Sequence, residues 1–290
     1  MRYTLRQLEV FLSVAKQDSV TRAARELALS QSAVSEALAE LEGQFGIQLF
    51  ERVGKRLQLS ELGRALRPAA ESLHAQALEL EGQLASQARV GTVRIGATLS
   101  IGDYLVPPLM ARFMTDHGRA TLHVANTAEI ARKVLNFELD IGIVEGEVVE
   151  PQLEVVRWRA DELVVFCAPT HPFAKKKRLS DADLRSARWI VREPGSGTRQ
   201  AFERALHGLL PELEIALELQ HTEAIMNAVK AGLGVGCISR IALADSLAHH
   251  TLVACRVPQR NFQRSFYFLL HKQKYQSAGV RAWLELCKRA

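Results

Sequence analysis

The sequence predicts three successive parts: an α-helical N-terminal domain that contains a helix-turn-helix, one long helix, and a larger α/β domain. Two short amphipathic stretches joined by a tight turn occupy residues 19–45, and apolar residues spaced by three and four continue through residues 60–88. From residue 91 onward, short apolar stretches alternate with helical ones, which is typical of α/β layers with largely parallel sheets. We therefore expect domains at residues 1–59, 60–88 and 91–290.

Residues 19–45 are predicted to form two helices that cross closely. The first helix carries Ala23, Ala24 and Leu27 on one face, and the second has apolar and small residues at helical spacing. Ser30 is placed where its hydroxyl accepts from the free N–H groups at the start of the second helix. In a helix-turn-helix the first residues of the second helix meet base edges in the DNA major groove, so the pattern indicates DNA binding. An all-α domain without DNA is the alternative.

Polar groups on the second helix and a basic hairpin after it are the candidate contacts to DNA. Amide and hydroxyl side chains both donate and accept at base edges, whereas cations beside them hold phosphates. Residues 49–59 predict a hairpin that turns at Gly54, with three cations near its tip. We expect the DNA-contacting residues to be Thr21, Arg22, Gln31, Ser32, Ser35, Glu36, Arg52, Lys55 and Arg56.

The segment LRQLEVFLSVAKQDSVTRAARELALSQSAVSEALAELEGQFGIQLFERVGKRLQLSELG resembles the winged helix-turn-helix of LysR-type transcriptional regulators. The stretches DIGIVEG, DELVVFCAP, REPGSGTR and HTEAIMNAVKAGLGVGCISR are similar to the YeiE and CysL/CbbR-like branch of that family. The resemblance implies a two-lobed effector domain like the periplasmic binding proteins of type 2. It places lobe I at about residues 91–161 and 267–290, and lobe II at about residues 162–266.

One residue of the second helix departs from the family pattern. The family usually has Arg, Lys or Gln directly after the serine that matches Ser35, whereas this chain has Glu36. A carboxylate near phosphates is unfavourable unless it accepts from a cytosine amino group or turns away. The sequence alone leaves two possibilities open: Glu36 contacts a cytosine amino group, or its side chain turns away from the DNA.

Composition sets the limits within which these predictions stand. The 290 residues, of which 48% are hydrophobic, suggest about two domains with sizeable cores. No apolar run approaches the roughly 18 residues of a membrane span, and the N-terminus lacks a signal-peptide core, so we expect a cytoplasmic protein. The net charge of +5 does not itself indicate DNA binding, because residues 1–90 hold 11 Lys and Arg against 11 Asp and Glu. The basic excess lies in residues 91–290.

The long helix predicted over residues 60–88 has a narrow apolar stripe. A helix of this length extends roughly 43 Å and needs a partner for such a stripe. Antiparallel pairing with a second subunit gives a homodimer or homotetramer, and packing on the same chain is the alternative. Two linked helix-turn-helix units imply an inverted-repeat operator, and Pro68 predicts a local bend. The stripe comprises Leu62, Leu66, Ala70, Leu73, Ala77, Leu80 and Leu84.

The strongest candidate for a ligand site is the turn at residues 192–199. Its glycines permit a tight turn, its hydroxyls and the following helix start offer donors, and Arg199 adds positive charge, a combination that suits an anion. A glycine turn capped by its own serine is the alternative. The family resemblance implies that turns of the other lobe face it. The candidate ligand-binding residues are Thr98, Ser100, Asn126, Thr127, Glu145, Gly195, Ser196, Gly197, Thr198 and Arg199.

These observations predict a sequence-specific regulator whose operator binding responds to a small anion such as sulfite, sulfate, phosphate or a small carboxylate. An α/β enzyme acting on a phosphorylated substrate is one alternative, but no nucleophile, base and orienter set and no phosphate-binding loop motif accompanies the turn. A DNA-binding protein without an effector is the other. No metal or cofactor is expected. The four cysteines lack CxxC spacing and are interpreted as buried thiols, with a redox-sensing pair as the alternative.

Overall fold

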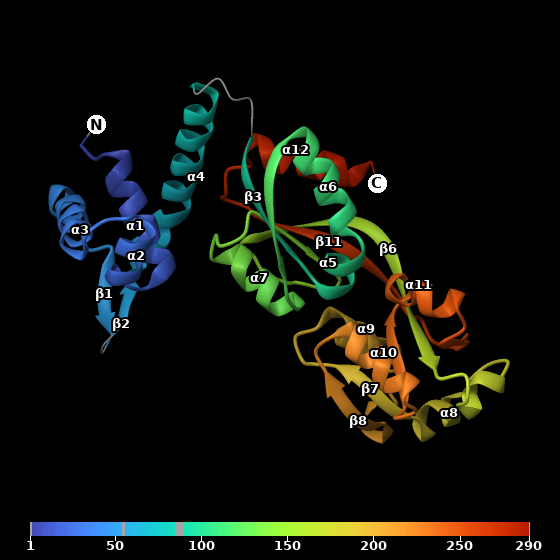
Figure 1. The fold of residues 1–290 in the computed structure, drawn as a ribbon. Helices are drawn as coiled ribbons and strands as arrows, with labels where there is room; N and C mark the ends of the chain where they lie inside the picture. Colours follow the sequence, from blue (N-terminus) through green and yellow to red (C-terminus); the bar gives the residue numbers. More distant parts are fainter. Residues whose placement is uncertain (1, 54–55, 85–89, 290) are drawn as a thin grey trace.

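The computed structural model describes residues 2–53, 56–84 and 90–289. Three bodies follow one another across Figure 1: a small N-terminal head at the left, a long helix standing beside it, and a two-lobed α/β domain at the right. Lobe I lies next to the long helix, and lobe II lies below lobe I.

The head is a three-helix unit with a β-hairpin. Thr4 caps the first helix with a reciprocal pair of hydrogen bonds to Gln7, and Gly46 ends the third with a φ of 66°. Leu8 and Phe11 on the predicted apolar face of the first helix are buried, as sequence periodicity requires. The elements are α1 (Leu5–Gln17), α2 (Val20–Glu26), α3 (Gln31–Phe45), β1 (Phe50–Val53) and β2 (Arg56–Leu59), with β1 antiparallel to β2.

The long helix α4 (Glu61–Leu84) docks on both the head and lobe I. Ala70 is buried in the head, and the guanidinium of Arg67 lies 5.4 Å from the centre of the Phe137 ring of lobe I. Pro68 lies inside the helix. All five leucines of the predicted stripe are exposed in the single chain, and the end of the predicted helix, residues 85–88, falls outside the described part. The exposed leucines are Leu62, Leu66, Leu73, Leu80 and Leu84.

Two strands cross between the lobes and join their sheets. The sheet order is β4-β3-β5-β11-β6-β9-β7-β8, with β10 paired to β6. Pairs within each lobe are parallel, whereas β11 and β6 pair antiparallel with each other and with their neighbours. The expectation of largely parallel sheets holds for the strands within each lobe, whereas one crossing strand runs against the others in each lobe, β11 in lobe I and β6 in lobe II. The strands are β3 (Val90–Ala97), β4 (Gly118–Val124), β5 (Ile141–Val144), β6 (Leu153–Cys167), β7 (Arg188–Arg192), β8 (Glu214–Leu219), β9 (Val235–Ser239), β10 (Val253–Cys255) and β11 (Gln263–His271).

Helices cover both faces of each sheet, so each lobe has two apolar layers. Successive residues Phe268 and Leu269 of β11 enter different core clusters, as strand alternation requires. Phe113 and Trp283 pack edge to face in one layer of lobe I, with ring centres 5.5 Å apart. The helices are α5 (Leu99–Tyr104), α6 (Val106–Asp116), α7 (Thr127–Leu135), α8 (Asp181–Ser186), α9 (Gly197–Ala205), α10 (Thr222–Lys230), α11 (Arg240–Ala248) and α12 (Ala278–Lys288), with short 3-10 turns at Pro172–Lys175 and Leu210–Glu212.

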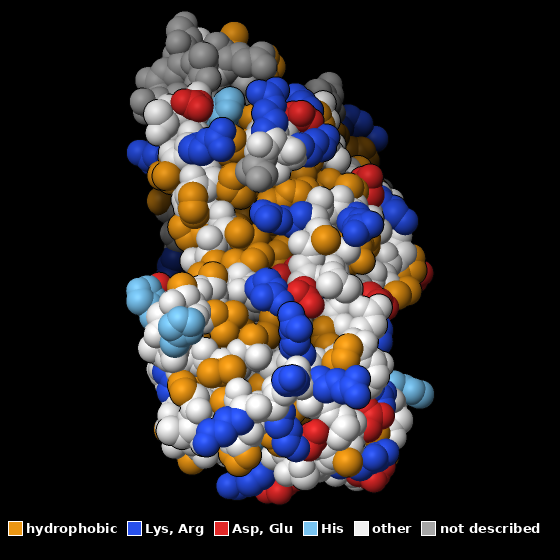
Figure 2. Space-filling view, turned by 90° about the vertical axis from the view of Figure 1, so that its right-hand side faces the viewer, with side chains coloured by type: hydrophobic (Ala, Val, Ile, Leu, Met, Phe, Trp, Pro, Cys, Tyr) orange, Lys and Arg blue, Asp and Glu red, His pale blue; other side chains and the backbone are white. Residues whose placement is uncertain are grey.

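Figure 2 shows one face of the molecule, on which apolar side chains gather near the middle. Lys and Arg side chains are scattered there among apolar and acidic ones. The four cysteines are buried and free, and burial raises the pKa of Cys287 to about 12, which keeps it a thiol. Cys167 and Cys255 bring their sulfur atoms within 3.5 Å of each other. None of the described helices is long and apolar enough to cross a membrane.

Candidate DNA interface and inter-lobe site

The start of α3 is organised by short polar contacts. The Ser30 hydroxyl accepts from the backbone N–H of Ala33 at 3.1 Å and lies 2.9 Å from the hydroxyl of Ser32. The Thr21 hydroxyl donates to the side-chain oxygen of Gln31 at 3.2 Å, which ties the two helices of the motif together. The cap leaves the first turn of α3 in a fixed orientation.

The polar side of α3 faces away from the rest of the chain. Val34 and Leu38 point into the head, whereas Ser32, Ser35 and Glu36 are exposed. In Figure 1 the helix lies at the outer edge of the head, on the side remote from α4 and both lobes. A duplex could approach this side without meeting lobe I or lobe II.

Of the three cations predicted for the hairpin, the structure describes the side chain of one. Arg52 is exposed on β1. Lys55 and the turn at Gly54 fall outside the described residues, as does the side chain of Arg56, whose backbone belongs to β2. Arg22 is exposed on α2, but its guanidinium donates to the backbone oxygen of Gln17. The hairpin geometry agrees with a basic wing, and its grip on phosphates stays a prediction.

The buried centre of the inter-lobe contact is the carboxylate of Glu145, at the end of β5. It accepts from the hydroxyl of Thr98 in lobe I at 3.0 Å and from that of Thr198 in lobe II at 2.8 Å. The guanidinium of Arg264 lies 3.7 Å away, and both charged side chains are only 1% exposed. A buried carboxylate needs such partners, because an unpaired charge in this setting is strongly unfavourable.

Arg264, near the start of β11, joins this carboxylate to a second one. Its Nε donates to Asp161 at 2.6 Å and its Nη1 to the Thr198 hydroxyl at 2.9 Å. The Ser239 hydroxyl also donates to Asp161, at 2.9 Å. Sequence reasoning missed this arginine. The available signal was a cation at the start of an otherwise apolar strand.

The backbones of the two lobes meet directly beside this network. The N–H of Ala128 donates to the carbonyl oxygen of Gly195 at 3.2 Å. A Cβ on Gly197 would lie 2.4 Å from the backbone nitrogen of Gly146, so a larger residue has no room there. The Asn126 amide donates across the gap to Glu193 at 3.3 Å. The lobes are therefore closed on each other.

The predicted anion turn lies between β7 and α9, as its sequence indicated. Gly195 adopts a φ of 84°, and the Ser196 hydroxyl accepts from the N–H of Thr198 at 3.2 Å. Arg199 does not supply a free charge, because it bonds to Glu203 at 2.5 Å and lies 3.4 Å from Glu218. The cap and the ion pairs account for much of the polarity of this turn without a ligand.

Two cavities flank the inter-lobe contact. One, of about 350 Å³, brings five of the predicted ligand residues together, and the hydroxyl of Thr127 at its wall is buried without a partner in the described structure. The other, of about 360 Å³, has Glu145 and Gly197 in its wall together with Arg264. Ser100 is buried and lines neither cavity. The five residues of the first cavity are Thr127, Gly195, Ser196, Gly197 and Arg199.

At the mouth of the cleft, α5 of lobe I meets α10 of lobe II. The Tyr104 hydroxyl donates to the Glu223 carboxylate at 2.8 Å. Burial and this carboxylate raise the pKa of Tyr104, so the phenol stays protonated and keeps donating. Glu223, in the first turn of α10, therefore makes a contact that holds the lobes together.

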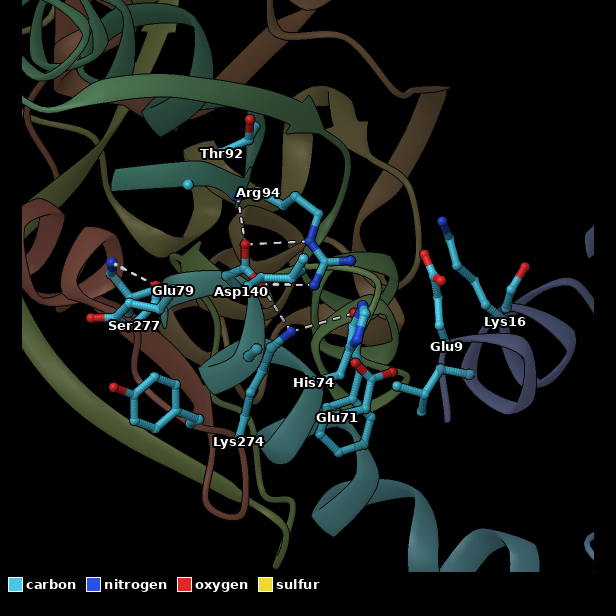
Figure 3. A pocket seen from close by; sticks show the side chains of 18 of the residues that line it. Glu9, Lys16, Glu71, His74, Glu79, Thr92, Arg94, Asp140, Lys274 and Ser277 are labelled. Carbon is cyan, nitrogen blue, oxygen red and sulfur yellow. Dashed lines mark hydrogen bonds and ion pairs between the residues drawn. The ribbon is translucent and has the colours of Figure 1, made fainter. Parts of the chain in front are cut away.

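A third cavity, of about 670 Å³, lies between lobe I on one side and the head and α4 on the other (Figure 3). In its wall Asp140 accepts from Arg94 at 2.8 Å and lies 3.0 Å from Lys274. Burial alone would raise the pKa of Asp140, but these two cations outweigh burial and lower the pKa to about 2. Within the described residues, no group of His, Cys, Asp and Glu side chains could hold a metal ion.

Two family models together match almost the whole chain. A model described as "Bacterial regulatory helix-turn-helix protein, lysR family" matches residues 5–64, and one described as "LysR substrate binding domain" matches residues 86–290. "Uncharacterized HTH-type transcriptional regulator YeiE" of Escherichia coli K12 is 45% identical over 289 residues, which is 99% of this chain and 98% of that protein. The "RuBisCO operon transcriptional regulator" of Allochromatium vinosum is 33% identical over 289 residues, which is 98% of this chain and 95% of that protein.

Solved structures share the fold over the full length. Full-length OxyR from Pseudomonas aeruginosa superposes with a TM-score of 0.73 at 21% identity, covering 100% of this chain and 94% of that one. Full-length CbnR in complex with its target DNA gives 0.58 at 20% identity, with 99% of each chain covered. The regulatory domain of CcmR from Synechocystis PCC6803, in complex with 2-PG, gives 0.63 at 26% identity over 68% of this chain and 96% of that one.

Proposed function

Since this chain belongs to the LysR family of DNA-binding transcriptional regulators, we propose that it binds an inverted-repeat operator as a homo-oligomer and that a small anion held between its lobes changes that binding. The matching families are those of regulators, so they give no support to an enzyme acting on a phosphorylated substrate. Because a regulator of this kind must reach chromosomal DNA, we also propose that the protein works in the cytoplasm.

The DNA-binding surface in this proposal is the exposed side of α3 with the wing beside it. Gln31, Ser32 and Ser35 read base edges, while Arg52, with Lys55 and Arg56, holds the phosphate backbone. Two observations support this assignment: the Ser30 cap fixes the start of α3, and Gln31, Ser32 and Ser35 in its first turns are exposed. A full-length relative in fold, CbnR, has been solved with its target DNA.

The oligomer forms through α4. Its leucines are exposed in the single chain, with Leu80 at 56% and Leu84 at 76%, and such a stripe is normally covered by another helix. Leu80→Glu places a charge in that contact. We expect the variant to sediment as a monomer where the wild type is a dimer or tetramer, while Glu81→Gln, one residue along on α4, leaves the sedimentation coefficient unchanged.

The anion site in this proposal is the cavity between the starts of α7 and α9. One observation carries the proposal: the Thr127 hydroxyl is buried at the cavity wall without a partner among the described residues, beside the start of α9, where the potential is positive. An unmatched buried donor is unfavourable, and a ligand oxygen would satisfy it. The fold relative CcmR binds 2-PG in its regulatory domain.

The inter-lobe network then supplies the response to the ligand. Thr98 and Glu145 belong to lobe I, and Thr198 and Arg264 to the lobe II side, so the network forms fully only when the lobes are closed. An anion that touches Thr127 and the turn at Gly195 contacts both lobes and stabilises the closed form by its difference in affinity for the two forms. Closure would shift the linked heads and thereby the fit to two half-sites.

An anion titration of the full-length protein tests this site. We expect sulfite, sulfate, phosphate or a small carboxylate to raise the melting temperature of the wild type, and Thr127→Val to abolish the rise. Thr115→Val, an exposed threonine on α6, is the matched control and should behave as the wild type. No rise with any of these anions would contradict the anion site, and an equal rise in the Thr127 variant would contradict its placement.

A further inference from the structure

Glu36 lies close to the middle of the exposed side of α3. It follows Ser32 by one turn, which places it about 40° around the helix axis from that serine. The buried residues Val34, Leu38 and Leu41 lie on the opposite side of the helix. If α3 enters the groove with its polar side, the Glu36 carboxylate enters with it.

Among the described residues, the Glu36 carboxylate has no hydrogen-bond or ion-pair partner, unlike its acidic neighbours on α3. Glu40 accepts from the side-chain amide of Gln7 at 3.1 Å, and Glu42 accepts from the backbone N–H of Leu49 at 2.6 Å. No cation whose side chain the structure describes lies within ion-pair distance of Glu36, and the side chain is exposed. Its charge is therefore available to an external partner.

A carboxylate that faces duplex DNA has few favourable contacts. The phosphates repel it, and in the major groove only the amino groups of cytosine and adenine donate. Adenine places the acceptor N7 beside its amino group, and guanine and thymine present acceptor oxygens, so these three bases repel a carboxylate at least in part. Cytosine presents its amino donor without that adjoining N7 acceptor.

We propose that Glu36 makes this protein select a cytosine at one position of each operator half-site by accepting a hydrogen bond from the cytosine amino group. The inference rests on the proposed DNA-binding function of α3. The carboxylate acts mainly by penalising other sequences, because a duplex without cytosine at that position meets an unpaired negative charge. It therefore raises discrimination between sequences and lowers affinity for DNA in general.

Selection from a library of random duplexes, followed by sequencing, tests the proposal with the full-length protein. The wild type should enrich an inverted repeat in which each half-site has a cytosine at one fixed position, and the preference for this cytosine should depend on Glu36. Glu36→Ala should lose the preference at that position alone. Glu36→Gln should change it toward adenine, since an amide pairs with both the amino group and N7 of adenine. Glu81→Gln, on α4, is the matched control and should keep the wild-type motif.

Binding measurements on a selected site give a second readout. Replacing the cytosine by thymine puts an acceptor oxygen against the carboxylate, so the wild type should bind about tenfold more weakly, whereas Glu36→Ala should change little. On scrambled DNA, both Glu36 variants should bind more tightly than the wild type, because a repulsive charge has gone.

The outcomes separate this inference from the function on which it rests. If the wild type enriches a motif and Glu36→Ala enriches the same motif at every position, the cytosine proposal is overturned while the regulator function stands. If the wild type enriches no motif at all, both are overturned. Equal melting temperatures of the variants would confirm that any change comes from the interface, as expected for an exposed side chain.

Discussion

The head and the inter-lobe site use the same kinds of polar side chain in opposite ways. On α3, Ser35 and Glu36 are exposed, whereas between the lobes Thr98, Glu145 and Thr198 are buried and bonded to one another. Exposed groups can be changed without disturbing the fold, because water already satisfies them. Buried groups hold the lobes together, so the proposed ligand would act by altering an existing network. In the proposed function, the exposed side of α3 contacts DNA and the inter-lobe site responds to the ligand.

The largest effect that this contrast predicts is at Arg264. Arg264→Ala leaves Asp161 and Glu145 as buried carboxylates without their cation, and we expect a loss of about 3 to 5 kcal/mol in the free energy of unfolding. Urea denaturation of the full-length protein measures it.

Arg240→Ala is the matched control for Arg264. Arg240 pairs with Glu162 at 3.0 Å on the surface, and such a pair contributes about 0 to 1 kcal/mol. Similar losses for the two variants would contradict the distinction between the buried network and the surface.

Asp140 predicts a smaller effect that depends on pH. Its pKa in the folded protein, about 2, lies below the ordinary 3.8, so its stabilisation is present above pH 4 and is lost as the pH falls toward 2. The difference corresponds to about 2 kcal/mol. The wild type should exceed Asp140→Asn by this amount at pH 6, and about half of the gap should be gone at pH 3.

Unfolding curves at several pH values, with Asp116→Asn on α6 as an exposed control, measure the Asp140 contribution. A gap that stays constant between pH 6 and pH 3 would show that the carboxylate is not held ionised by Arg94 and Lys274.

A third, weaker effect, on the stability of the closed form, is expected from a change at Tyr104. Tyr104→Phe removes one hydrogen bond to Glu223 at the partly exposed mouth of the cleft, and we expect it to destabilise the closed form by about 1 kcal/mol. Small-angle scattering should then report a more open average shape. Tyr275→Phe, at the cavity beside α4, should leave the scattering profile as it is. An unchanged profile for the Tyr104 variant would mean that this bond does not hold the lobes.

Ser35 predicts the smallest change in stability together with a clear change in DNA binding. Ser35→Ala should alter the free energy of unfolding by no more than about 0.5 kcal/mol, because the residue is exposed. Operator affinity should nevertheless fall several-fold, measured by fluorescence anisotropy at fixed salt, since Ser35 faces the bases in the proposed interface. Unaltered affinity would remove Ser35 from that interface.

The sequence predicted the elements that depend on local patterns. The apolar face with Leu8 and Phe11, the cap at Ser30 and the pairing of β1 with β2 all follow from residues close together in the chain. Their partners are near in sequence or repeat at a regular interval, so periodicity and capping chemistry suffice to find them.

One feature that the sequence did not reveal, the buried network around Arg264, depends on distant partners. Arg264 and Asp161 are 103 residues apart, and neither position carries a local signal for the other. The first half of β6 was missed because charged residues such as Arg157 and Arg159 interrupt its apolar character. Arg199 was assigned to an anion, although Glu203 four residues later was a visible helical partner.

The most direct test of the regulator with an anion-dependent switch is quantitative footprinting of the full-length protein on operator DNA with and without candidate anions. We predict protection of an interrupted inverted repeat, and a change in the protected pattern or midpoint with at least one anion in the wild type but not in Thr127→Val. Equal protection of random DNA would contradict the assignment of α3 as a reading helix. Identical footprints with every anion would contradict the coupling between the lobes and the head.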